Sequence, residues 1–61
     1  MIPSQDARQV AWSLGYPEAR LSVVRRWMES RGWASLDDYG RYAMHQDRET
    51  TRKAFEAFAL R

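Results

Sequence analysis

The side chains that could carry out chemistry are few in this sequence, and their spacing does not assemble a catalytic centre. The one histidine, His45, is followed by Asp47 and Glu49 in a polar stretch. A metal ion needs several donors held at matched spacing, which one histidine beside two surface acids does not supply. Asp37 and Asp38 are adjacent carboxylates, but they fall in the first turn of a predicted helix, where acids stabilise the helix dipole. We therefore expect neither a metal site nor acid–base catalysis.

Nucleophilic chemistry has equally little support. There are no cysteines, which excludes disulfides, thiolate ligands and a cysteine nucleophile. Ser4 and Ser35 are better explained as helix caps, and Ser13 and Ser22 have no histidine base in a suitable position. The three glycines are too widely separated to form a phosphate-binding loop. We expect a protein that is not an enzyme and holds no cofactor.

Arginine is the remaining chemically distinctive residue. Nine arginines and one lysine stand against eight acids, so the formal net charge is +2. A balance this mild neither requires nor excludes a polyanionic partner. Arginine side chains bind phosphates and base edges in nucleic acids, and they also anchor protein interfaces. The function therefore depends on where the helices place them.

The elements that position these side chains are predicted to be helices. No alternating run of β-branched residues and no Asn-Gly or Asp-Gly turn indicates a strand. Ser4 as N-cap, apolar residues three and four apart, and Gly15 as a stop predict a helix over about residues 5–14.

A second helix is predicted directly after this glycine. Pro17 suits the first turn of a helix, where its missing N–H costs nothing. Gly32 supplies the corresponding stop, so this helix should run over about residues 17–31. Its apolar stripe consists of Leu21, Val24, Trp27 and Met28.

The C-terminal half carries the signals for one or two more helices. Ser35 and Asp38 form a variant of the capping box at the start of a third helix. Gly40 costs about 1 kcal/mol against alanine within that helix, and it marks a place where another helix could approach closely. Asp47 can cap a fourth helix, and the sequence leaves open whether the third and fourth are separate. We predict that residues 1–61 form a single all-α domain, a compact bundle of three or four short helices.

The spacing of residues around the first glycine has a further meaning. Ala11 lies four residues before Gly15, and the run VRRW occupies residues 24–27 of the predicted second helix. The apolar residues on either side of the turn are Val10, Leu14, Tyr16, Leu21 and Val24. In this pattern, residues 7–27 resemble the helix-turn-helix of phage repressors, excisionases and related regulators. The VRRW run also resembles the end of the second helix in excisionase-like and MerR-like proteins.

This resemblance implies a small DNA-binding protein, a transcriptional regulator of bacterial or phage type. Residues 17–31 would be the recognition helix in the major groove of double-stranded DNA. Ser22 and Arg26 would contact bases, and Val23 would lie against thymine methyl groups. The implied phosphate contacts are Arg8, Arg20, Arg25 and Arg31. Because one such module makes few contacts, the resemblance also implies a dimer.

The competing hypothesis is a protein-binding module or a phage- or plasmid-borne inhibitor. Trp12 and Tyr42 lie off the apolar faces of their predicted helices, and Val23 lies outside the stripe of the second. Exposed aromatic residues and arginines are common interface anchors, and a homodimer would also use such a surface. The residues alone leave a third alternative open, in which another helix covers Val23 and the arginines are solvated.

The expected location is the cytoplasm. No apolar run approaches the length of a bilayer span. The N-terminal residues open into polar sequence without the basic and apolar regions of a signal peptide. We therefore expect no membrane partner.

Overall fold

Four helices make up the computed structural model, which describes all residues from Met1 to Arg61. They are α1 (Ser4–Leu14), α2 (Leu21–Ser30), α3 (Leu36–Ala43) and α4 (Arg48–Ala59). This confirms the predicted small all-α bundle, and it settles that α3 and α4 are separate helices. None of the four is long and apolar enough to cross a membrane.

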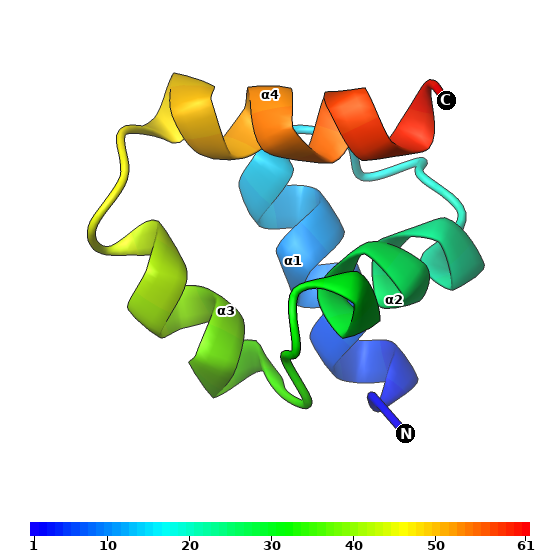
Figure 1. Cartoon of the computed structure of the whole chain (residues 1–61). Coiled ribbons are helices and arrows are strands. Elements are labelled where there is room, and N and C mark those ends of the chain that lie inside the picture. The colour runs from blue at the N-terminus through cyan, green and yellow to red at the C-terminus, as the bar shows by residue number, and fades with distance from the viewer.

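The helices are arranged around α1. Figure 1 shows α1 in the centre, α2 and α3 on either side of it, and α4 across one end of the bundle. α1 packs against each of the other three helices, and α4 also packs against α2. The fully buried apolar side chains are Ile2, Ala7, Val10, Ala11, Leu14, Val24, Trp27, Met28, Tyr39 and Phe55. The core thus lies where the three- and four-residue spacing places it.

Glycine ends α1 and α2, as predicted. Gly15 has φ 84°, a left-handed conformation that other residues adopt only with strain. The Tyr16 N–H donates to the Ala11 carbonyl (2.9 Å), which is the long-range bond of a Schellman motif. Gly32 has φ 78° and ends α2 in the same way. These two turns fix the directions in which the chain leaves the first two helices.

The helix predicted over residues 17–31 is wrong at its start, because α2 begins at Leu21. Pro17 instead occupies the second position of a β-turn, in which the Ala19 N–H donates to the Tyr16 carbonyl (3.0 Å). The fixed φ of proline suits this position as well as it suits the first turn of a helix. The first turn of the predicted helix is therefore part of the connection.

Side-chain caps begin the last two helices, as predicted. The Ser35 hydroxyl accepts a hydrogen bond from the Asp38 N–H (3.4 Å) at the start of α3. The Asp47 carboxylate accepts a shorter bond from the Thr50 N–H (2.6 Å) at the start of α4. Both caps satisfy N–H groups that have no partner within the helix.

Two other local predictions are wrong. Ser4 does not cap α1: it is the first helical residue, Pro3 holds the cap position, and the Ser4 hydroxyl accepts a bond from Arg25 instead. Gly40 does not mark a close approach, since no atom lies within 4 Å of where its Cβ would be. A small residue inside a helix thus predicts a helix contact poorly here.

The carboxylates at the two caps should make folding sensitive to acid. Hydrogen bonds from Thr50 hold the pKa of Asp47 below its usual value of 3.8, and the N–H of Ala34 lowers the pKa of Asp38. Because the unfolded chain binds these protons more readily, the stabilisation is present above pH 3.8 and is lost as pH falls through the lowered values. We expect the free energy of unfolding, measured with denaturant at a series of pH values, to decrease as the pH is lowered below 3.8.

Asp47→Asn tests the origin of that loss, since asparagine keeps the capping oxygen but does not titrate. The variant should lose less stability than the parent between neutral pH and the acid range. Glu18→Gln, at an exposed acid outside the helices, is the control and should follow the parent. An Asp47→Asn curve that matches the parent would show that this cap does not set the acid sensitivity.

Candidate functional site

Neighbouring elements cover α2 on three of its sides. Its core side carries Val24, Trp27 and Met28. α4 packs along one flank, and the segment before α1 lies along the other. The side chains that remain exposed on the fourth side are Ser22, Arg26 and Glu29. These three residues are spaced four and three apart and form one ridge, which we call the α2 ridge.

Val23 lies on the flank that α4 covers. Its side chain is half-buried and packs against the core. With Phe55 and Ala59 of α4 and with Leu60, which follows that helix, it lines an apolar groove of about 270 Å³. An apolar residue can lie outside the core stripe here because a second helix, α4, covers it. This was one of the alternatives that the sequence left open.

Arg25 holds the N-terminal segment against the other flank. Its Nε donates to the carbonyl of Ile2 (3.1 Å), and a terminal nitrogen donates to the Ser4 hydroxyl. Ile2 is 2% exposed, so this anchor fixes a buried apolar residue. Two of the Arg25 N–H groups that would contact phosphate therefore already donate hydrogen bonds within the fold.

Arg31 lies over a cluster of aromatic rings. Its guanidinium carbon is 4.8 Å from the ring centroid of Tyr42, 5.5 Å from that of Trp33 and 6.0 Å from that of Trp27. Tyr42 is half-buried and lies 4.9 Å from Trp33. Arg31 and Tyr42, predicted for different surfaces, are thus brought together in one cation–π cluster.

The other predicted phosphate contacts, Arg8 and Arg20, are exposed, as Arg26 is. None of the three arginines forms an ion pair, because all ion pairs join residues within α3 or within α4. Residues 1–34 hold five arginines against three acids, whereas residues 35–61 hold five of each sign. The excess positive charge therefore belongs to residues 1–34.

The connection between α1 and α2 is longer than the helix-turn-helix pattern implies. Six residues separate the helices, against three or four in a typical turn of this kind. Tyr16 fixes the connection to α4: its hydroxyl donates to the Glu56 carboxylate, and this bond raises the pKa of Tyr16. α2 has ten residues, or a length of about 15 Å, and a helix of its diameter fits the major groove of DNA.

Two features of the surface bear on other functions. Trp12 is 62% exposed on α1, in agreement with its place off the apolar face. No three histidine, aspartate or glutamate side chains form a group that could hold a metal ion.

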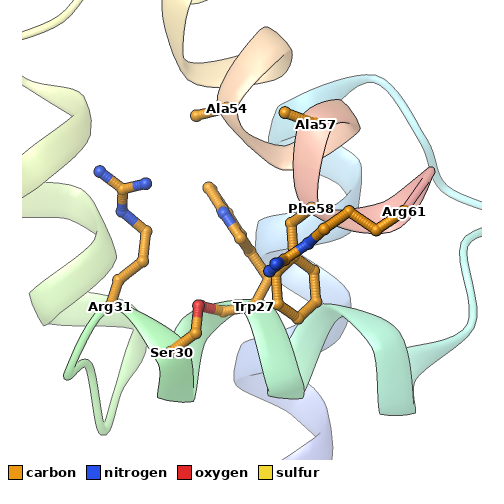
Figure 2. Close-up of a pocket in the computed structure, with 7 residues that line it drawn as sticks. All are labelled: Trp27, Ser30, Arg31, Ala54, Ala57, Phe58 and Arg61. Carbon is orange, nitrogen blue, oxygen red and sulfur yellow. The ribbon is translucent and has the colours of Figure 1, made fainter.

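A groove between the C-terminal halves of α2 and α4, drawn in Figure 2, was not expected from the sequence. Of its lining residues only Arg31 was a predicted site residue, and Phe58 and Arg61 were not. No local signal relates them to Arg31, since they lie 27 and 30 positions after it in the sequence.

Arg25 and Arg26 are adjacent on α2, but they should contribute differently to the free energy of unfolding. Arg25→Ala removes two hydrogen bonds to the N-terminal segment, so the unfolding free energy should fall by about 1 kcal/mol. Arg26→Ala removes a solvated side chain and should change it by less than about 0.5 kcal/mol. Denaturant unfolding of both variants measures the difference. Equal losses would contradict the anchoring role of Arg25.

No protein-family model, curated protein or solved structure matches this chain. The likeness to helix-turn-helix proteins therefore stays a prediction that rests on the residue pattern.

Proposed function

We propose that this protein binds double-stranded DNA through the α2 ridge. The observation that carries the proposal is the exposure of Ser22 and Arg26 on the one side of α2 that no other element covers. Arginine presents a planar fork of donors that matches the acceptor pair of guanine in the major groove. A serine hydroxyl one turn earlier can donate to or accept from a neighbouring base.

We expect exposed arginines outside the ridge to provide the phosphate contacts. Arg20 directly precedes α2, and Arg8 projects from α1, which packs against α2. Neither has a carboxylate partner, so contact with phosphate does not require an ion pair to be broken. The predicted phosphate contacts are therefore reduced to Arg8 and Arg20, because Arg25 and Arg31 are held by contacts within the fold.

Glu29 limits how the ridge can lie on DNA. Its carboxylate can accept a hydrogen bond from cytosine N4, and it repels phosphate. The ridge should therefore point Glu29 at a base edge and keep it away from the backbone. With one acid and three free arginines a single copy makes few contacts, so two copies on adjacent half-sites are the expected binding form.

DNA binding should depend steeply on salt and on Arg26. We expect binding to mixed-sequence duplex DNA at low salt to weaken sharply by about 200 mM salt, because counterions are released from phosphate. Against a selected site, Arg26→Ala should weaken binding by about tenfold, whereas Arg8→Ala should lower the salt slope by about 1. Fluorescence anisotropy at several salt concentrations measures both effects.

The control for this experiment is Arg48→Ala. Arg48 is also exposed and has no ion pair, but it begins α4, away from the α2 ridge. Its removal changes the net charge by the same amount and should leave affinity for the selected site nearly unchanged. No binding at low salt, or equal weakening by Arg48→Ala and Arg26→Ala, would exclude the α2 ridge as the DNA-binding surface.

The second candidate function, self-association or binding to another protein, is favoured by the exposure of Trp12. If Trp12 anchors a homodimer, Trp12→Ala should convert dimers to monomers in sedimentation equilibrium without loss of helical circular dichroism. A parent protein that is monomeric at high concentration would contradict the homodimer.

A further inference from the structure

The groove in Figure 2 combines an apolar floor with a basic rim. It has a volume of about 600 Å³ and lies between α2 and α4. Trp27 and Phe58 form the floor together with two alanines, Ala54 and Ala57. Ser30, Arg31 and Arg61 form the rim.

The charged side chains at the rim are both arginines. Arg31 and Arg61 lie on opposite sides of the Trp27 ring, and Arg61 extends across the Phe58 ring (Figure 2). No acid lines the groove, and neither arginine forms an ion pair. The groove is therefore complementary to an anion.

Each of the two guanidinium groups lies over an aromatic ring, and their edges are the main polar groups that a ligand in the groove can contact. Arg31 lies over the Tyr42 ring at 4.8 Å, and Arg61 lies over the Phe58 ring at 5.1 Å. A guanidinium that lies over a ring keeps N–H donors free at its edges, and a carboxylate can accept two of them.

The same stacking disfavours nucleic-acid bases. Single-stranded nucleic acids bind through free aromatic faces. Trp27 is 1% exposed and Phe58 is half-buried under Arg61, so neither ring is open for stacking. The available chemistry is that of a carboxylate beside a small apolar surface.

An unpaired donor lies at the floor of the groove. The Nε1–H of Trp27 is buried and has no hydrogen-bond partner. Ser30 is not its partner, and the Ser30 hydroxyl donates to the Trp27 carbonyl instead (2.6 Å). A buried donor without an acceptor is unfavourable, and its resonance responds to any new acceptor or charge nearby.

We propose that this groove binds an acidic segment of a partner protein. A glutamate or aspartate of that segment pairs with Arg31 and Arg61, and an adjacent apolar side chain covers Ala54, Ala57 and Phe58. The groove is open along its length, which suits a side chain presented by a protein surface better than a small molecule that must be enclosed. The α2 ridge takes no part, so this binding does not depend on DNA binding.

The test is a titration of the ¹⁵N-labelled protein followed by NMR. The probe is a capped peptide with two glutamates on either side of a phenylalanine, and the matched control peptide carries glutamines. The three tryptophans give three indole N–H resonances. The Trp27 resonance should shift to saturation with the acidic peptide, and that of Trp12 on the surface of α1 should not. The glutamine peptide should bind about tenfold more weakly.

Variants assign the binding to the two arginines. Arg31→Gln and Arg61→Gln should each weaken the acidic peptide about fivefold, whereas Arg48→Gln at the far end of α4 and Arg26→Ala on the α2 ridge should leave it unchanged. Arg61 is the last residue and contacts only Phe58 among the rings, so Arg61→Gln remains informative if Arg31→Gln perturbs the aromatic cluster.

Three results would overturn the proposal. One is a Trp27 resonance that does not move with the acidic peptide. Another is equal weakening by Arg48→Gln and Arg61→Gln, which would indicate a general charge effect. The third is a Trp27 shift caused by duplex DNA or inorganic phosphate and not by the peptide, which would assign the groove to phosphate. Loss of DNA binding in Arg26→Ala would leave the proposal intact.

Discussion

The indole of Trp27 is the contact on which the four-helix arrangement depends. It is 1% exposed and meets Trp33, Phe55 and Tyr39 edge-on, with ring centroids 5.2, 5.3 and 6.2 Å away. These partners lie in the α2–α3 connection, α4 and α3. A chain of this size has no disulfide and little surface to bury, so aromatic area and edge-to-face geometry replace a larger aliphatic core.

The position of the Trp27 indole between the helices determines which arginines are free to contact a partner. Arg31 follows Trp27 by one turn and is drawn over the rings that surround it, whereas Arg25, on another side of the helix, reaches the N-terminal segment. Arg26 lies between them in sequence but faces away from the core. Orientation around one short helix thus divides chemically identical side chains into structural anchors and donors available to a partner.

The two proposed surfaces share α2 but use different sides of it. The α2 ridge is polar, convex and carries one acid, as expected for a helix that inserts into a groove. The groove beside α4 is concave and apolar with cationic edges, as expected for a site that receives a side chain. Since α4 and the N-terminal segment hold both flanks of α2, either surface is presented by a helix that is already fixed in place.

Local chemistry in the sequence determined the all-α class and several helix ends, but it left open whether the third and fourth helices are separate. Gly15 and Gly32 are needed wherever a helix stops in a left-handed turn, and Asp47 caps α4 whatever surrounds it. The start of α2 was not determined locally, because Pro17 fits a β-turn and a first helical turn equally well. Only the tertiary structure decided the roles of the arginines and the existence of the groove. Arg25 contacts Ile2, and Arg31 and Arg61 line one groove, across distances in sequence over which residue spacing carries no information.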